Sequence, residues 1–207
     1  MNHAIEILMK EHRTIEEVLA ALEGLADEAA RGAPVDRAAV ARFARFFREF
    51  ADRCHHGKEE NILFATLVER GMPSETGPIA VMLEEHRMGR VLVGALAALG
   101  DGAGEMRPDE RTHFHTSAKE YISLLRVHIQ KEDQILYPMA VRFLPAGILE
   151  DLARRFEAFE RDEIGPGKHE AIHREVQDLL DRRTTGCPAC GGHEEASGAG
   201  APGPSSA

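Results

Sequence analysis

The feature that most restricts the fold of this 207-residue chain is a pair of segments that repeat one pattern 73 residues apart. Residues 55–64 and 128–137 each begin with a His, carry a Glu four residues later, and continue with an acid, an amide side chain and an Ile-Leu-aromatic triplet. On a helix, residues four apart lie on one face, so each His and Glu would point the same way just before an apolar anchor. A single His/Glu pair of this kind usually lies on the solvent-exposed surface of a helix. Two copies in the same context indicate metal ligands.

A second repeat lies upstream of each copy. Residues 11–13, which read Glu-His-Arg, reappear 74 residues later as residues 85–87. The chain therefore contains two copies of one helical hairpin, each with a His on its first helix and a His/Glu pair on its second. Two such hairpins related by a pseudo-twofold axis form an antiparallel up-down four-helix bundle, so we predict an all-α fold.

In such a bundle the repeated side chains would meet at one depth in the interior. Unpaired imidazoles and carboxylates are costly to bury, so their convergence predicts a bound cation. The predicted metal ligands are His12, His55, Glu59, His86, His128 and Glu132.

The repeat also decides between two neighbouring histidines. His55 and His56 each have a Glu four residues later, at Glu59 and Glu60. Only His55 aligns with His128 and with the apolar triplet that follows it. Around an α-helix, His56 would point about 100° away. We therefore expect His56 and Glu60 to orient the ligands or to lie at the surface, with coordination by His56 as the alternative.

The apolar periodicity predicts helices throughout and no strand of useful length. The predicted helices span residues 3–31, 36–71, 79–100, 108–139, 146–164 and 168–183. We expect residues 1–145 to form the four-helix bundle and residues 146–183 to form a helical extension packed on it. Residues 184–207 are rich in Gly, Ala, Ser and Pro, which predicts a disordered tail.

Composition restricts the partners and the compartment. The formal charge of −10 argues against binding to nucleic acid or to an anionic membrane. No apolar run reaches the roughly 20 residues that a membrane span needs, and the first residues lack an export pattern. Three cysteines do not make a disulfide framework, and Cys54 is predicted to be a buried free thiol. We expect a cytoplasmic protein.

The ligand chemistry narrows the choice of ion. Imidazole and carboxylate without thiolate suit iron, zinc or manganese. Six inward ligands with a twofold relation suit two ions bridged by carboxylates better than one ion. The residues thus predict a dinuclear site and leave the metal open.

Over about residues 3–145 the chain resembles the hemerythrin-like family of His-His-Glu cation-binding proteins. The resemblance rests on the two Glu-His-Arg segments and the two His/Glu pairs, the second of which is followed by Ile-Leu-Tyr-Pro. It implies a four-helix bundle with a non-haem di-iron centre, in which carboxylates and an oxo or hydroxo group bridge two iron ions. It also implies a site where dioxygen or a related small molecule binds.

One position departs from the pattern of hemerythrins that carry oxygen reversibly, which have a second His four residues after the one that corresponds to His86. Here that residue is Arg90, so a fifth His is missing. The difference argues against simple oxygen carriage. It would leave a coordination position for water, for substrate or for Tyr121, two turns before His128. The alternative is that Tyr121 is a core residue whose hydroxyl is hydrogen-bonded.

We therefore expect a di-iron protein that binds or reacts with dioxygen, peroxide or nitric oxide and receives electrons from a redox donor. As an enzyme it would be an oxidoreductase that consumes peroxide or nitric oxide. As a binding protein it would sense or store iron or oxygen without turnover. A metal-free helical interaction module is the third interpretation.

Two further motifs lie after the bundle. His169, Glu170 and His173 have the spacing of a zinc-protease helix, but no third ligand region is evident. We expect them to cap one end of the bundle. Cys187 and Cys190 form half of a zinc-ribbon-like site or a redox pair.

Overall fold

The computed structural model describes residues 2–165, in which the regular elements are all helical. In chain order they are α1 (His3–Ala30), α2 (Arg37–Phe46), η1 (Phe47–His56), η2 (Glu59–Phe64), α3 (Ala65–Glu69), α4 (Gly77–Gly100), α5 (Pro108–Lys131), η3 (Glu132–Leu136), α6 (Tyr137–Phe143), α7 (Ala146–Phe159) and η4 (Glu160–Ile164). The elements named η are π-helical, with hydrogen bonds from residue i to residue i+5.

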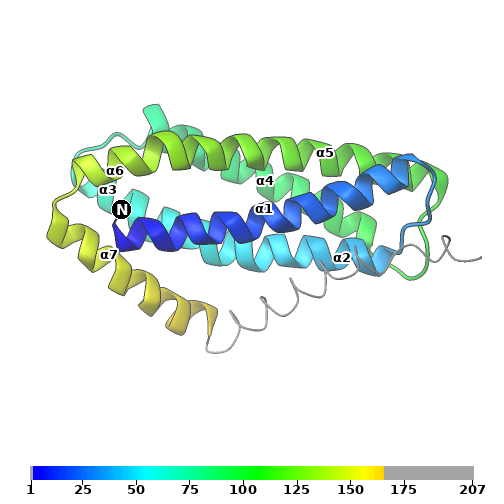
Figure 1. Ribbon diagram of the computed structural model, residues 1–207, viewed down its shortest axis with the longest axis horizontal. Coiled ribbons are helices and arrows are strands. Elements are labelled where there is room, and N and C mark those ends of the chain that lie inside the picture. The colour runs from blue at the N-terminus through cyan, green and yellow to red at the C-terminus, as the bar shows by residue number, and fades with distance from the viewer. Residues whose placement is uncertain (1, 166–207) are drawn as a thin grey trace, which may run out of the picture.

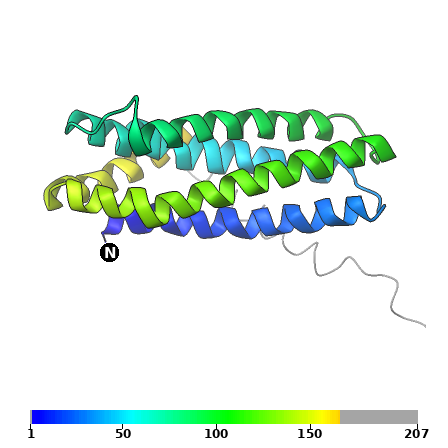
Figure 2. The same ribbon diagram turned by 90° about the horizontal axis from the view of Figure 1, so that it is seen from above.

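Four long rods lie side by side and form the bundle (Figures 1 and 2). The first rod is α1 and the third is α4. The second runs from α2 through η1 and η2 to α3, and the fourth from α5 through η3 to α6, each with helical backbone at the joints. Helix α1 packs against α5, α2 against α4, and α4 against α5. This arrangement confirms the predicted all-α bundle.

The rods begin and end close to the predicted residues, for local reasons. The carboxylate of Asp36 accepts a hydrogen bond from the backbone N–H of Ala38 at 3.1 Å, the capping role expected where α2 begins. The fourth rod runs to Phe143, a few residues past Met139. Pro138 is the second residue of α6 and directly follows the π-helical turn η3.

Two apolar clusters fill the bundle, one toward each end. The first packs the middle and C-terminal half of α1 against α2, α4 and α5, with Phe46, Phe47 and Phe114 among its largest members. At this end Gly100 lets α4 approach α2, because a Cβ there would lie 2.7 Å from the backbone nitrogen of Ala41. The second cluster packs the start of α1 against α3, α6 and α7. The predicted ligands lie between the two clusters.

Helix α7 leaves the end of the bundle and runs obliquely back along α1 (Figure 1). Its buried face closes the second apolar cluster and consists of Leu149, Leu152, Ala153 and Phe156. The predicted helix over residues 168–183 and the predicted tail over residues 184–207 lie outside the described residues, as do the motifs at His169 and at Cys187. In the part of the chain that the structure describes, no helix is long and apolar enough to cross a membrane.

Candidate metal centre

The structure brings all six predicted ligands together inside the bundle. One comes from α1, two from the second rod, one from α4 and two from the fourth rod, so every rod contributes. Each of the six side chains is at most 1% exposed. The amphipathic repeat explains this placement, because apolar residues on both sides of each ligand fix the inward face of its helix.

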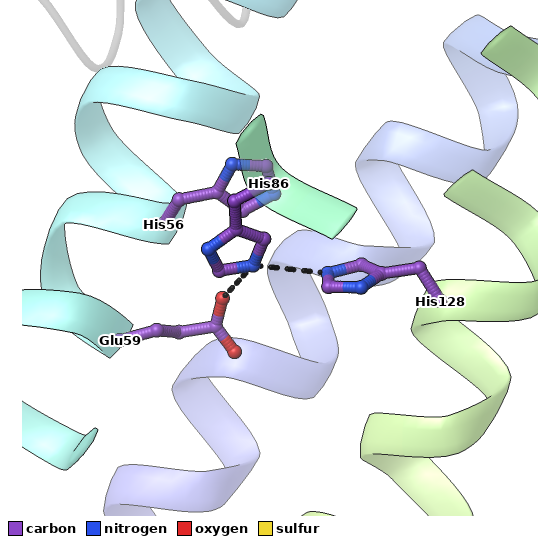
Figure 3. A group of neighbouring side chains, drawn as sticks. All are labelled: His56, Glu59, His86 and His128. Carbon is purple, nitrogen blue, oxygen red and sulfur yellow. Dashed lines mark hydrogen bonds and ion pairs between the residues drawn. The ribbon is translucent and has the colours of Figure 1, made fainter. Parts of the chain in front are cut away.

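Three imidazoles and a carboxylate form the first of two ligand groups, drawn in Figure 3. His56, Glu59, His86 and His128 each offer an atom within 4.8 Å of the others. The Nε2 atoms of His86 and His128 lie 3.1 Å apart, and Nε2 of His86 lies 3.5 Å from Oε2 of Glu59. Four buried donors at this spacing can surround one cation.

The second group shares Glu59 with the first and contains two imidazoles and two carboxylates. Its members are His12, His55, Glu59 and Glu132. The Nε2 atom of His12 lies 3.3 Å from Oε2 of Glu132, and Nε2 of His55 lies 3.6 Å from Oε2 of Glu59. Glu132 also reaches the first group, since its Oε2 lies 3.2 Å from Nε2 of His128. Both carboxylates thus stand between the groups, where they could bridge two ions.

Several of these atoms have no hydrogen-bond partner among the described residues. They are Nε2 of His55, Nε2 of His56, Oε2 of Glu59 and both carboxylate oxygens of Glu132. Leaving a buried polar atom unsatisfied costs about 1–3 kcal/mol, and more for a charged group. The atoms face one another, so bound cations would satisfy them together. The donor set therefore fits a metal-binding site.

His56 lies inside the bundle beside the predicted ligands, and not at the surface. It is 5% exposed and stacks on His86, with ring centroids 3.8 Å apart and planes 13° from parallel. The expected rotation of 100° away from His55 assumed an α-helix, whereas η1 is π-helical where the two residues lie. A π-helical turn brings neighbouring side chains only slightly closer in direction, yet both rings are buried. His56 is thus a fifth imidazole that could serve as a ligand, which is the alternative that the sequence left open.

A carboxylate orients each of the five imidazoles by accepting a hydrogen bond from its Nδ1. The pairs are His12 with Asp133 at 2.7 Å, His55 with Glu11 at 2.9 Å, His56 with Asp52 at 3.4 Å, His86 with Glu60 at 2.7 Å and His128 with Glu85 at 3.0 Å. Carboxylates placed in this way fix the tautomer of a metal-binding His and raise its basicity. Each ring consequently presents Nε2 to the centre.

A basic side chain in turn binds each of these carboxylates. Lys58 pairs with Glu11, Arg13 with Asp133, Lys131 with Glu85, and Arg90 with both Asp52 and Glu60. Arg90 and Glu60 therefore contact the residues that orient the ligands or the ligands' Nδ1 atoms, and not the centre itself. They hold His56 and His86 in place, which is the orienting role expected for Glu60.

Burial and neighbouring charges set the protonation of the imidazoles. Burial, together with the neighbouring imidazole of His56, lowers the pKa of His86 to about 3. Burial also lowers the pKa of His55 and of His56 well below the ordinary value. Burial acts against protonation of His12 too, but Asp133 and Glu132 outweigh it and raise the pKa to about 9. Three rings are therefore neutral at pH 7, the form that binds metal.

The two central carboxylates titrate far apart. Burial and the negative charge of Glu132 raise the pKa of Glu59 well above its ordinary value. Burial would raise the pKa of Glu132 as well, but the nearby rings of His128 and His12 lower it to about 2. Repulsion between two buried carboxylates has this effect, and a cation between them would remove it.

The tyrosine at the centre is Tyr137 and not Tyr121. Its hydroxyl donates a hydrogen bond to Oε1 of Glu59 at 2.7 Å and lies 3.3 Å from Nε2 of His12. Tyr121 belongs to the first apolar cluster, where it packs edge-on against Phe47 with ring centroids 4.8 Å apart. The sequence repeat could have indicated Tyr137, because the aligned residue in the other half is Phe64, which lacks a hydroxyl.

An open cavity of about 490 Å³ lies outside the first ligand group. Arg90, Asp52 and Glu60 line it on the side of the centre, and Phe159, Glu163 and Ile164 line it from the C-terminal extension. Only one layer of hydrogen-bonded side chains therefore separates His56 and His86 from this cavity.

Comparison with known proteins agrees with this geometry. Residues 3–140 match the family described as hemerythrin HHE cation binding domain. The chain is also 24% identical over 181 residues to uncharacterised proteins of Mycobacterium bovis and of two strains of Mycobacterium tuberculosis. These alignments cover 85% of this chain and 68% of each relative. No solved structure matches the chain.

Proposed function

Because the chain belongs to the hemerythrin HHE cation-binding family, we propose that it is a non-haem di-iron protein that reacts with dioxygen, peroxide or nitric oxide. The observation that carries the proposal is the convergence of five buried imidazoles and two buried carboxylates, several of whose inward atoms have no hydrogen-bond partner among the described residues. Such a set is costly to bury without cations.

The arrangement favours two ions over one. The two ligand groups overlap only at Glu59, and Glu132 reaches members of both. Neither group contains a thiolate, and imidazole with carboxylate suits iron. We propose that Glu59 and Glu132, with the imidazoles around them, would hold the two ions. Ferrous ions held here would supply electrons to the small ligand.

The residues around the centre would control protons and water. The hydroxyl of Tyr137 is buried beside Glu59 and His12, so it can donate a proton inside the site. The two apolar clusters enclose the centre along the bundle axis and limit the entry of water. A proton donor beside a bridging carboxylate favours reduction of a bound ligand such as peroxide. The protein would then be an oxidoreductase that draws electrons from a redox donor.

Reversible binding is the second candidate, and His56 favours it. With His56 in the ligand set the centre has five imidazoles, so Arg90 no longer counts against oxygen binding. In this case the protein would sense or store oxygen or iron without turnover. We propose the cytoplasm for either function, because Cys54 is a buried free thiol, and free thiols are usual in proteins of reducing compartments.

The two candidates differ in what happens after the ligand binds. The protein is loaded with ferrous iron without oxygen and mixed in a stopped-flow instrument with dioxygen, hydrogen peroxide or nitric oxide in turn. Repeated consumption of peroxide or nitric oxide in the presence of a reductant supports an enzyme. A stable oxygen adduct that disappears when oxygen is removed supports binding. Absence of any absorbance change with all three ligands would reject both candidates.

A further inference from the structure

The C-terminal extension lies beyond the matched residues 3–140, yet it contacts the helix that carries His55 and Glu59. The extension turns at Phe159 from α7 into η4, and η4 packs against η1. The guanidinium of Arg53 donates a hydrogen bond to the backbone oxygen of Glu163 at 3.1 Å, and Ile164 is buried. The described part of the extension, which stops at Gly165, thus lies beside the helix that carries His55 and Glu59.

A glycine inside the ligand motif makes this contact possible. A Cβ on Gly57 would lie 2.8 Å from the ring of Phe159, which is closer than real Cβ atoms approach. The aligned residue in the other half of the chain is Gln130, whose side chain is exposed. Gly57 therefore accommodates the extension, although a glycine within a helix lowers its stability.

The polar link between the extension and the centre passes through Lys58. Its side chain is fully buried, and its ammonium pairs with Glu11 and, at 2.5 Å, with Glu160 of η4. Glu11 accepts the hydrogen bond from Nδ1 of His55 at 2.9 Å. These contacts join Glu160 to a predicted metal ligand in three steps. A buried ammonium needs such partners, and burial would otherwise lower its pKa.

The other half of the bundle provides an internal comparison. There Lys131 pairs with Glu85, which holds His128 in the same way. The side chain of Lys131 is 31% exposed, however, and Glu85 is its only acidic partner among the residues that the structure describes. Each half of the bundle thus contains a Lys–Glu–His chain of contacts, and Glu160 adds a second carboxylate to the chain that ends at His55.

We propose that Glu160 is a positioning residue for the metal centre, which makes the C-terminal extension part of the site. The inference rests on the proposed function, because it concerns how firmly the ions are held. The carboxylate of Glu160 neutralises part of the positive charge of the Lys58 ammonium. The carboxylate of Glu11 then remains available to hold His55. Without Glu160, Lys58 would be neutralised by Glu11 alone, and Glu11 would hold His55 less firmly.

The test compares Glu160→Gln with Glu163→Gln, a matched change on the same helix at an exposed side chain. Each protein is loaded with ferrous iron without oxygen, and release of iron to a coloured chelator is followed over time. Removing a direct partner of a ligand costs about 10- to 100-fold in metal affinity, so removing Glu160, which lies two steps beyond the direct partner Glu11, should accelerate release less, by up to about tenfold. In Glu160→Gln, about half of the iron, the ion held by the group that contains His55, should be released faster. In Glu163→Gln the rate of release should not change.

A second comparison separates positioning from a general loosening of the fold. If Glu160 acts through Lys58, Glu160→Gln should have no further effect on release in a Lys58→Met protein. If Glu160→Gln still accelerates release there, or if both ions leave faster and the metal-free protein melts at a lower temperature, the role is structural and the inference fails. Identical release from Glu160→Gln and wild type would also overturn it. A wild-type protein that holds no iron would instead contradict the proposed function.

Discussion

Replacing His56 with Leu should raise the stability of the metal-free protein and lower its metal content. The Nε2 atom of His56 is buried with no partner in the described part of the chain, which costs about 1–3 kcal/mol. The aligned position in the other half is Ile129, which is 2% exposed, so an apolar side chain fits this register. The substitution therefore removes a buried polar atom without opening a large cavity.

The expected gain is reduced by the contacts that His56 makes. These are a long hydrogen bond of 3.4 Å to Asp52, which keeps Arg90 as a partner, and the stacked ring of His86 at 3.8 Å. Because the hydrogen bond is long and two neutral stacked imidazoles attract weakly, each contact contributes about 0.5 kcal/mol, the low end of the usual range, against a gain of about 2 kcal/mol. The net gain should be about 1 kcal/mol at pH 7, which raises the melting temperature of a chain of this size by about 2–4 °C.

The gain should increase in acid. Burial lowers the pKa of His56 well below 6.5, so below pH 6.5 the unfolded chain binds a proton at this residue and the folded chain does not. Proton binding by the unfolded chain alone destabilises the folded state as the pH falls. His56→Leu removes this effect, and its advantage over wild type should grow by about 2 kcal/mol between pH 7 and pH 5.

Two measurements on one preparation test this reasoning. Calorimetry of the metal-free protein gives the melting temperature at each pH, and mass spectrometry of the iron-loaded protein gives the metal content. We expect about one iron per chain in place of about two, because His56→Leu removes a donor from the three-imidazole group. His113→Leu, at an exposed position on α5, is the control. A variant that melts lower when metal-free and still binds as much iron as wild type would refute a ligand role for His56.

Three further predictions concern single contacts. Tyr137→Phe should slow peroxide consumption about 100-fold without changing the iron content, because the proton donor beside Glu59 is lost. Tyr121→Phe, the control, should change neither the rate nor the iron content. Equal rates for the two variants would contradict this. Gly57→Ala should lower the free energy of unfolding, measured in urea, by about 1 kcal/mol, because the added Cβ displaces the ring of Phe159. In a Phe159→Ala background, Gly57→Ala should instead raise the free energy of unfolding by a similar amount, because Ala favours the helix. A change of the same sign in both backgrounds would show that the ring is not the cause. Glu23→Gln should cost less than about 1 kcal/mol at pH 7, because its ion pairs with Arg126 and Lys119, which lower the pKa of Glu23 to about 2, are largely exposed and screened by solvent. That pKa predicts that the difference from wild type persists above pH 4.5 and disappears as the pH falls to about 2, which urea titrations at several pH values would measure.

The fold and most of the ligand set could be predicted because one pattern fixes both. The helical period places the apolar residues inward, and the repeat at His55 and His128 locates the second hairpin relative to the first. Once the four helices pack with their apolar faces inward, the depth at which the ligands meet follows from their equal distance along each helix.

The positions that the sequence left open depend on local backbone and packing. A regular α-helix would separate His55 and His56 by about 100°, but both rings are buried where the backbone is π-helical. Tyr121 was considered because it lies on the face of His128, but its ring packs against Phe47. The contact of Lys58 with Glu160 joins residues 102 positions apart, and no repeat in the sequence marks it.

The metal content of the protein tests the central claim most directly. Protein loaded with ferrous iron without oxygen and freed of excess ions is expected to hold about two irons per chain, and the double variant His55→Ala/His128→Ala should hold none, because each group loses a donor. A wild-type protein without bound iron, or a double variant that keeps both ions, would contradict the account.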